Sequence, residues 1–179
     1  MSYYALDPDE SKKLLAWWHW LDDNRGDRAV LRRADIAEDV LLTPAFASFL
    51  QFMPAAWGEG NRLFDSALVA GLLARVKTLE SNPKISFAQA LATPKQGGSK
   101  AVMSELRFQQ LQKSRDPDEF FRRMTRAVAL LGGNVNLLSL ADGVLHWSRE
   151  HRYSVDREPT KRLAVRWARD YYTAFKDKA

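Results

Sequence analysis

The stretch of sequence that decides the fold class is residues 116–131, DPDEFFRRMTRAVALL. Asp116 can cap a helix, Pro117 suits its first turn, and Glu119 can reach back to the cap residue. Apolar side chains then follow at helical spacing, namely Phe120, Phe121, Met124, Val128 and Leu131. The stretch therefore predicts an amphipathic helix that begins beside Asp116 and packs on a core.

The same kind of start signal recurs elsewhere in the chain. Residues 7–10 also read DPDE, and they precede apolar residues at helical spacing, namely Leu14, Trp17, Trp18 and Leu21. Thr43-Pro44 and a capping box at residues 86–89 predict two more helix starts. Further helical patterns cover residues 27–34, 62–79, 99–113, 137–149 and 159–175. No segment reads as a strand, so the sequence predicts an all-α fold, a compact helical bundle of about eight or nine helices in two small lobes.

The charge balance changes within the chain. Residues 1–98 contain 11 Lys and Arg residues against 12 Asp and Glu, whereas residues 99–179 contain 16 against 10. The change coincides with the sequence TPKQGGSK at residues 93–100, which reads as a loop. We expect an N-terminal helical lobe of residues 1–92 and a basic C-terminal lobe of residues 99–179, joined in one continuous structural unit. A second polar connection is expected at residues 151–157.

Composition and motifs exclude several classes of site. The chain has no cysteine, so it has no disulfide, no zinc–thiolate site, no iron–sulfur cluster and no cysteine nucleophile. His19 has the spacing of a helical metal site with Asp22 and Asp23, but this group reads as a helix end at the surface. No phosphate-binding loop and no nucleophile motif is present. We therefore expect no enzymatic activity, no catalytic residue, no bound metal and no cofactor.

The sequence also indicates a cellular compartment. It contains no run of about 18 apolar residues, which a membrane-spanning helix would need. Its N-terminus lacks the basic and apolar segments of a signal sequence. We expect a cytoplasmic protein without a membrane partner.

The excess of positive charge suggests a polyanionic partner, because neutralising phosphates releases counterions and the planar arginine fork matches phosphate geometry. Arg107 lies in or beside the apolar stripe of its helix. An arginine at such a position needs an anionic partner, or it must extend its aliphatic stem over the core and place its guanidinium group at the edge of a groove. Arg123 flanks the apolar face of the next helix, whereas Arg122 and Arg126 point to solvent. Arg107 and Arg123 are therefore the better candidates for a shaped groove. A structural pair with a carboxylate and an ordinary solvated face remain alternatives.

Other basic and aromatic residues are less decisive. The last predicted helix carries one continuous stripe of charge, Arg162, Arg166 and Arg169. This stripe fits either a phosphate path or solvated surface, and surface is slightly favoured. In the N-terminal lobe, Arg32-Arg33 is the only pair of adjacent arginines. The six tryptophans could stack on bases, but their spacing with leucines favours the core, with Trp20 as the exception.

Five further segments, taken in order, resemble one known family. They are GDRAVLRRA at residues 26–34, SFAQALA at 86–92, SELRFQQL at 104–111, LHW at 145–147 and WARDYY at 167–172. Together with residues 116–131 they span nearly the whole chain, in the order and spacing of the CasB family. The chain therefore resembles CasB proteins.

CasB proteins are the small subunit of Cascade, the type I-E CRISPR RNA-guided surveillance complex of antiviral defence. The resemblance implies an all-α fold without enzymatic activity. It implies as partners the other Cascade subunits, the CRISPR RNA complex and a second copy of the chain packed head to tail. It also implies basic grooves that steady the target strand and the displaced strand of the R-loop. In such systems the guide reads the sequence, while the protein handles backbone and shape.

The resemblance carries DNA-contacting arginines over to this chain. The position after the Trp147 helix matches either Arg149 or Arg152, and Arg62 matches a family position loosely. Lys95 and Lys100 lie in a loop whose length varies in the family, so the resemblance assigns no role to them. With the best matches first, the expected nucleic-acid-binding set is Arg33, Arg107, Arg123, Arg32, Arg62, Arg122, Arg149, Arg152 and Arg162.

The leading hypothesis is a non-catalytic Cascade subunit that binds DNA backbone without sequence preference and stabilises the R-loop. The alternative is a helical scaffold whose basic surface contacts acidic protein partners without touching nucleic acid. A helix-turn-helix regulator would need one recognition helix, and the dispersed arginines argue against it. A small helical enzyme has no positive feature in its favour.

Overall fold

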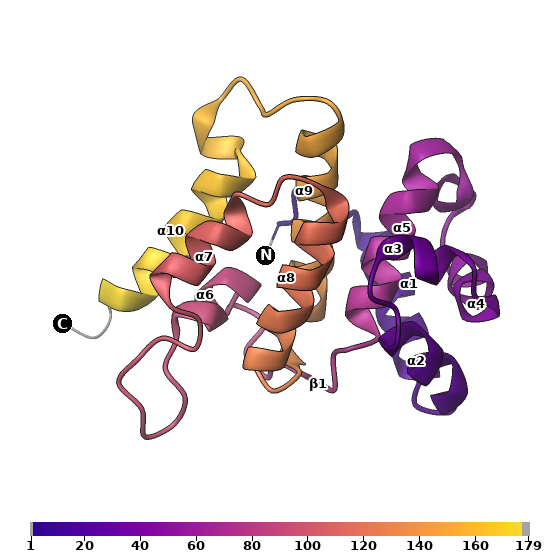
Figure 1. The fold of residues 1–179 in the computed structure, drawn as a ribbon, viewed down its shortest axis with the longest axis horizontal. Helices are drawn as coiled ribbons and strands as arrows, with labels where there is room; N and C mark the ends of the chain where they lie inside the picture. Colours follow the sequence, from indigo (N-terminus) through magenta and orange to yellow (C-terminus); the bar gives the residue numbers. More distant parts are fainter. Residues whose placement is uncertain (1, 177–179) are drawn as a thin grey trace.

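The computed structural model describes residues 2–176, with residues 175 and 176 described in the backbone only. Within this part of the chain the fold is all-α, as expected, with ten α-helices, two 3₁₀ turns and two strands of two residues (Figure 1). The α-helices are α1 Pro8–Trp20, α2 Arg25–Arg32, α3 Ala37–Leu41, α4 Pro44–Phe52, α5 Gly60–Leu73, α6 Phe87–Ala92, α7 Glu105–Gln112, α8 Pro117–Leu130, α9 Leu137–Arg152 and α10 Leu163–Lys176. None of these described helices is long and apolar enough to cross a membrane.

Helices α1 to α5 pack together as one group, on the right in Figure 1. Their centre is α5, which is buried at every position from Asp65 to Leu73 and packs against α2, α3 and α4. A 3₁₀ turn at Ala55–Gly58 precedes α5, and its Trp57 is buried against Phe49 of α4. Burial of this apolar surface is the main force that holds the group together.

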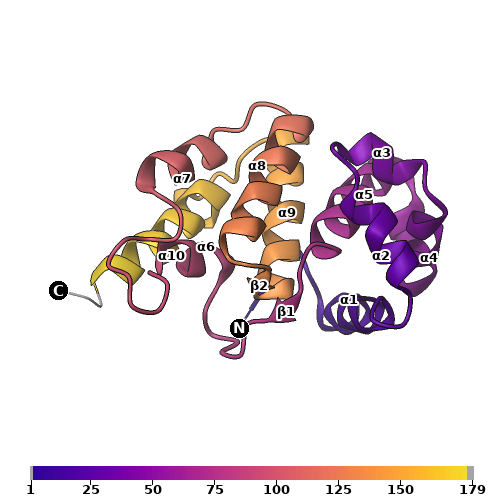
Figure 2. The ribbon, with the colours of Figure 1, turned by 60° about the horizontal axis from the view of Figure 1, so that its bottom comes forward.

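Helices α6 to α10 form the second group. In this group α6 packs along α10 and α7 packs beside α8. In both Figures 1 and 2, α8 and α9 form the side of this group that faces the first group, and both contact α5. The division into lobes of residues 1–92 and 99–179 stays a proposal. The packing of α6 on α10 favours an earlier boundary, between α5 and α6.

A short parallel sheet joins the two halves of the chain, although the sequence predicted no strand. β1 (Thr78–Leu79) pairs with β2 (Asn134–Val135), and Lys77 N–H donates to the carbonyl of Gly133 over 2.8 Å. Gly133 has a φ of 76°, in the left-handed region that favours glycine. A Cβ at this position would lie 2.8 Å from Cγ of Lys77. The close approach of the two strands therefore depends on the absence of a side chain.

The two helix starts at DPDE are confirmed. The side chain of Asp7 accepts the Glu10 N–H over 2.8 Å, and the Glu10 carboxylate accepts the Asp7 N–H in return. Asp116 accepts the Glu119 N–H over 2.9 Å. Both prolines stand in the first turn of their helices. These contacts satisfy backbone donors that a helix start would otherwise leave unpaired.

Two other helix boundaries differ from the sequence predictions. α5 ends at Leu73 instead of continuing to residue 79, because the chain leaves the helix to enter β1. α7 begins at Glu105 instead of residue 99, because the side chain of Ser104 caps its first turn. Apolar spacing alone therefore overestimated the length of both helices.

The tryptophans belong to the core, as their spacing indicated. Five of them are at most 7% exposed, namely Trp17, Trp18, Trp57, Trp147 and Trp167. Trp20 is half-buried, with its ring centroid 5.6 Å from that of Phe52. None of the six is therefore a freely exposed platform for bases.

Candidate nucleic-acid interface

A basic groove lies between α7 and α8, and we call it the α7–α8 groove. It encloses about 600 Å³ and is lined by Lys95, Met103, Arg107, Gln110, Leu111, Arg123, Arg126, Ala129 and Leu130. Four of these residues are positively charged, and none of the described residues in the lining is acidic. The groove brings together Arg107 and Arg123, two of the three best candidates from the sequence.

The floor of the α7–α8 groove is apolar. Met103 and Leu111 are core residues, 4% and 1% exposed, and Leu130 is partly buried against the same core. Met103 N–H donates to the carbonyl of Leu91, and Met103 O accepts the Tyr171 hydroxyl over 2.6 Å. The backbone beneath the groove is therefore held by α6 and α10.

Arg107 is exposed at the rim of this groove. Its place follows from the Ser104 cap, which starts α7 and so fixes the direction of each side chain on the helix. No ion pair joins Arg107 to any residue in the described part of the chain. Its charge is available to an external anion.

Arg123 is half-buried in the wall of the groove. Its guanidinium lies 2.5 Å from the Glu119 carboxylate, and it also donates to the carbonyl of Gln110 and, over 3.4 Å, to the Ser114 hydroxyl. Arg123 therefore braces the end of α7 against α8. Part of its charge is neutralised within the protein, in contrast to that of Arg107.

A second basic groove lies between α2 and α8, and we call it the α2–α8 groove. It encloses about 270 Å³ and is lined by Arg32, Arg75, Lys77, Thr125, Val128, Ala129, Gly132 and Gly133. Its described lining again holds cations and no carboxylate. Ala129 of α8 lines both this groove and the α7–α8 groove. The two grooves are therefore neighbours along α8, and together they connect the two halves of the chain.

Arg75 stabilises the wall of the α2–α8 groove. Its guanidinium donates to the carbonyls of Gly71 over 2.6 Å and Ala34 over 2.5 Å, and it caps the end of α2 by donating to the backbone carbonyl of Arg32 over 3.0 Å. Burial, and then the nearby charge of Arg32, lower the pKa of Arg75 to about 10. Arg75 therefore keeps its charge at neutral pH and adds to the positive potential of the groove.

A third groove, the α5–α9 groove, holds three more of the expected arginines. It encloses about 910 Å³, and its lining includes Arg62, Arg149 and Arg152 together with the acidic residues Asp65, Asp156 and Glu158. Arg152 donates twice to the Asp65 carboxylate, over 2.8 and 2.7 Å. Arg62 lies 3.4 Å from a Glu10 oxygen and 4.3 Å from the ring centroid of Trp57. The positive charge of this groove is therefore largely compensated.

The remaining expected residues are spread over the surface. Arg33 is exposed at the C-terminal cap of α2, next to Arg32. Arg122 is exposed on α8. Arg162 precedes α10, and its Nε donates to the carbonyl of Asp156 over 2.9 Å. The structure therefore places six of the nine expected arginines in three grooves, and the other three outside them.

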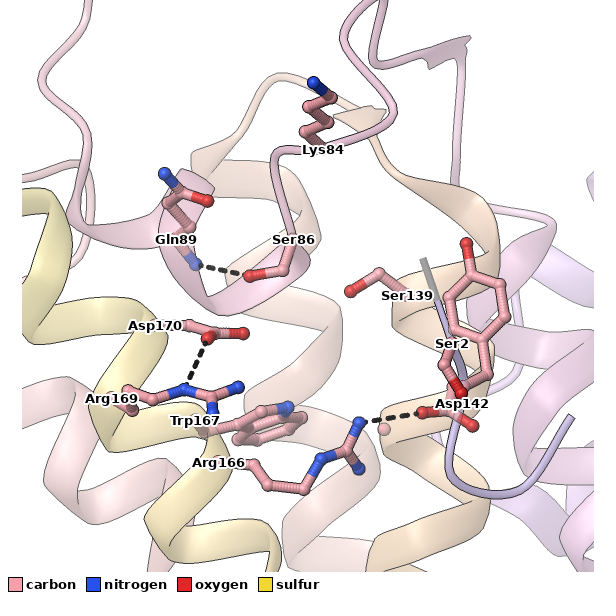
Figure 3. A pocket seen from close by; sticks show the side chains of 12 residues that line it. Ser2, Lys84, Ser86, Gln89, Ser139, Asp142, Arg166, Trp167, Arg169 and Asp170 are labelled. Atoms are coloured by element: carbon pink, nitrogen blue, oxygen red, sulfur yellow. Dashed lines mark hydrogen bonds and ion pairs between the residues drawn. The ribbon is translucent and has the colours of Figure 1, made fainter.

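Arg166 belongs to an interior cluster, so the interpretation of its stripe as solvated surface is wrong for this residue. Figure 3 shows its side chain directed from α10 toward Asp142 of α9. The guanidinium lies 3.3 Å from Asp142 Oδ2 and 2.8 Å from His146 Nδ1. Asp142 is 3% exposed and also accepts backbone N–H groups of the N-terminal segment, those of Tyr4, Ala5 and Leu6. The cluster therefore ties the N-terminal segment to α9 and α10.

His146 is a neutral member of this cluster. Burial, then the charges of Arg166 and Arg149, lower its pKa to about 4. Because Nδ1 accepts from Arg166, Nε2 carries the proton of the neutral ring. Nε2 lies 3.0 Å from a Glu150 oxygen, although its N–H is not aligned for a hydrogen bond. The Tyr4 ring stacks on the imidazole with 3.7 Å between the ring centroids, so His146 has a structural role.

Four basic residues of the two α8 grooves were missed or set aside by sequence reasoning. Arg126 was interpreted as solvent-facing, and Lys95 lies in a loop whose path the sequence does not define. Arg75 and Lys77 follow α5 and reach the α2–α8 groove through the turn before β1. Of these four residues, only Arg126 had a sequence feature that indicated its place in the groove, because it lies one helical turn from Arg123.

The fold and the grooves together define a small all-helical protein with cations concentrated in surface grooves on either side of α8. A family model described as CRISPR-associated protein Cse2 matches residues 27–172. The match covers most of the chain, so the chain belongs to the Cse2 family, the CasB small subunit of the type I-E Cascade complex. Proteins of this family are a non-catalytic subunit of Cascade. No curated protein and no solved structure matches the chain significantly.

Proposed function

We propose that this protein binds the sugar–phosphate backbone of DNA without sequence preference and thereby stabilises the target and displaced strands of an R-loop. The observation that carries the proposal is the α7–α8 groove, where four cations meet and no described lining residue is acidic. Membership of the Cse2 family supports the other Cascade subunits and the CRISPR RNA complex as partners. We also propose that a second copy of the chain belongs to the same assembly.

The side chains of the α7–α8 groove suit phosphates better than base edges. Arginine offers a planar fork of donors that matches phosphate oxygens, whereas sequence readout relies on several precisely placed donors and acceptors. Gln110 is the one neutral polar side chain in the described lining. The lining therefore favours contacts that are independent of sequence.

A strand bound in the α7–α8 groove has a continuation at the α2–α8 groove. The shared residue Ala129 places the two cavities next to each other, and Arg32 lines the second one beside the exposed Arg33. This order supports a path from α7 across α8 to the end of α2. The α5–α9 groove supports the proposal less, because two of its arginines already form ion pairs within the protein. Arg152 pairs with Asp65, and Arg62 pairs with Glu10.

A salt titration of the full chain with short DNA tests the proposal. Fluorescence anisotropy would give the affinity for two unrelated sequences over a range of salt concentrations. We expect similar affinities for both sequences and a steep decrease with salt. Arg107→Ala should weaken both complexes equally. It should also reduce the steepness of the plot of log affinity against log salt concentration by about 0.7, the value for one lost phosphate contact of a single strand.

Two variants serve as comparisons. Arg25→Ala removes the same charge from an exposed position at the other end of α2 from Arg32, and it should leave affinity and slope nearly unchanged. Arg123→Ala should weaken binding and also lower the melting temperature, because Arg123 braces α7 through Gln110 and Glu119. Equal effects of Arg107→Ala and Arg25→Ala would contradict the assignment of the groove.

The scaffold alternative makes the opposite prediction. If the basic grooves receive only acidic segments of neighbouring proteins, the full chain should not bind DNA at low salt, and R-loops formed by a complex with Arg33, Arg107 and Arg123 replaced by alanine should be as stable as before. Absence of DNA binding would replace the proposed function by the scaffold, and unchanged R-loop stability would show that the assignment of these three arginines is wrong.

A further inference from the structure

We propose that the α7–α8 groove holds an unpaired base as well as phosphates, so that it selects single-stranded DNA over duplex. This inference rests on the proposed function and specifies the state of the strand that the groove takes. It comes from the contrast between the floor and the rim of the groove.

The floor offers an apolar surface to a planar ligand. Its accessible apolar surface comes from Leu130, which is partly exposed, and Ala129, which is exposed, whereas Met103 and Leu111 are core residues that are 4% and 1% exposed. A site that served phosphates alone would have no use for such a floor, because phosphate gains nothing from apolar contact. A nucleobase, in contrast, gains free energy when its face leaves water.

The rim places cations around this floor. Arg107 approaches from α7, Arg123 and Arg126 from α8, and Lys95 from the loop before α7. A base seated on the floor would have its sugar and flanking phosphates at the level of these charges. A guanidinium plane can also stack on the exposed face of a base. Charge and shape therefore fit one nucleotide with its phosphates.

The size of the cavity agrees with such a ligand. About 600 Å³ lies within the range of roughly 300–1,000 Å³ that is typical of sites for small organic molecules. In a duplex the bases are stacked and paired inside the helix, so none can reach the floor without being unpaired first. Only a single strand can use the floor and the rim together.

Abasic DNA separates contacts to the base from contacts to the backbone. The full chain would be titrated with an oligothymidylate and with an abasic strand of the same length and charge. We expect the abasic strand to bind about fivefold more weakly, because it keeps the phosphates and loses the contact with the floor. Equal affinity for the two strands would overturn the base site and leave the proposed function standing.

A matched pair of variants locates the effect. Leu130→Gln makes the floor polar, and we expect it to weaken binding of oligothymidylate about threefold while leaving the abasic strand unaffected. Leu106→Gln is the same change at a side chain that is 66% exposed, next to Arg107 in the chain and absent from the groove lining, and it should change neither affinity.

The remaining outcomes are also decisive. If Leu130→Gln weakens both strands equally, Leu130 acts only through the fold and the base site is wrong. If duplex of the same length binds as tightly as the single strand, the proposed selectivity is wrong. Absence of binding to either strand would contradict the proposed function itself, and the base site with it.

Discussion

The carboxylate of Asp65 on α5 accepts two hydrogen bonds, of 2.8 and 2.7 Å, from the guanidinium of Arg152 at the end of α9. The two residues lie 87 positions apart, and their contact joins the N-terminal group of helices to the C-terminal group. The hydrogen bond to Asp65 raises the pKa of Arg152. Arg152, which the sequence suggested as a ligand of DNA, is therefore first of all a structural residue.

Arg152→Ala should lower the free energy of unfolding by about 2–4 kcal/mol, because it leaves the carboxylate of Asp65 buried without a partner. Urea denaturation measures the change. Arg149→Ala is the control, since Arg149 is exposed on the same helix and should cost less than about 1 kcal/mol. At low urea, where Arg152→Ala is still folded, its affinity for DNA should exceed that of Arg107→Ala. A stability equal to that of the parent chain would show that the pair contributes nothing.

His146 should make stability depend on pH below about 7. The unfolded chain takes up a proton near the ordinary pKa of 6.5, whereas the folded chain takes it up only near pH 4. The free energy of unfolding should therefore fall as the pH decreases from about 7 to 4, by about 2 kcal/mol between pH 7 and pH 5. Above about pH 7.5 both states are almost entirely neutral at this residue, and the effect is absent.

The variant His146→Gln isolates this contribution. Its carboxamide can still accept from Arg166 but does not titrate. Asp142, Glu150 and Asp156 also face the cluster, and the variant retains all three carboxylates. Urea denaturation of the two proteins at pH 7 and pH 5 compares their pH dependence. If the variant loses as much stability as the parent chain, His146 is not the cause.

Gly143→Ala should destabilise the contact between α9 and α10. A Cβ at Gly143 would lie 2.6 Å from Cζ2 of Trp167, which is buried between these helices. We expect a loss of about 1–3 kcal/mol, measured as a lower melting temperature by circular dichroism. Gly26→Ala is the control, because no atom lies within 4 Å of its added Cβ, and alanine in a helix should leave stability equal or higher. Equal melting temperatures for the parent chain and Gly143→Ala would show that Trp167 can move aside.

Local signals predicted much of the fold and the centre of the candidate site. The capping residues Asp7 and Asp116 start helices because their partners are three residues away, within the same motif. The place of Arg107 and Arg123 at the edge of apolar helix faces is likewise a property of one helix. Such features are written in adjacent residues, and sequence reasoning could find them.

Partners from distant parts of the chain could not be predicted in this way. Nothing near Arg152 indicates Asp65, and nothing near Arg166 indicates Asp142, because the packing of one helix on another decides these contacts. Both arginines therefore looked like free surface charges. The contact of His146 with Glu150 is different, since the spacing of four residues on one helix was a local signal for it.

The small side chain of Ala129 gives the proposed DNA path a further property. Since it lines both basic grooves, a strand already held in one of them keeps its next nucleotides at a high effective concentration beside the other. Two contacts that are each weak then act with the avidity of a bivalent ligand. The affinity for DNA would rise steeply once a strand is long enough to occupy both grooves. A subunit that binds short fragments weakly would therefore bind a long displaced strand tightly.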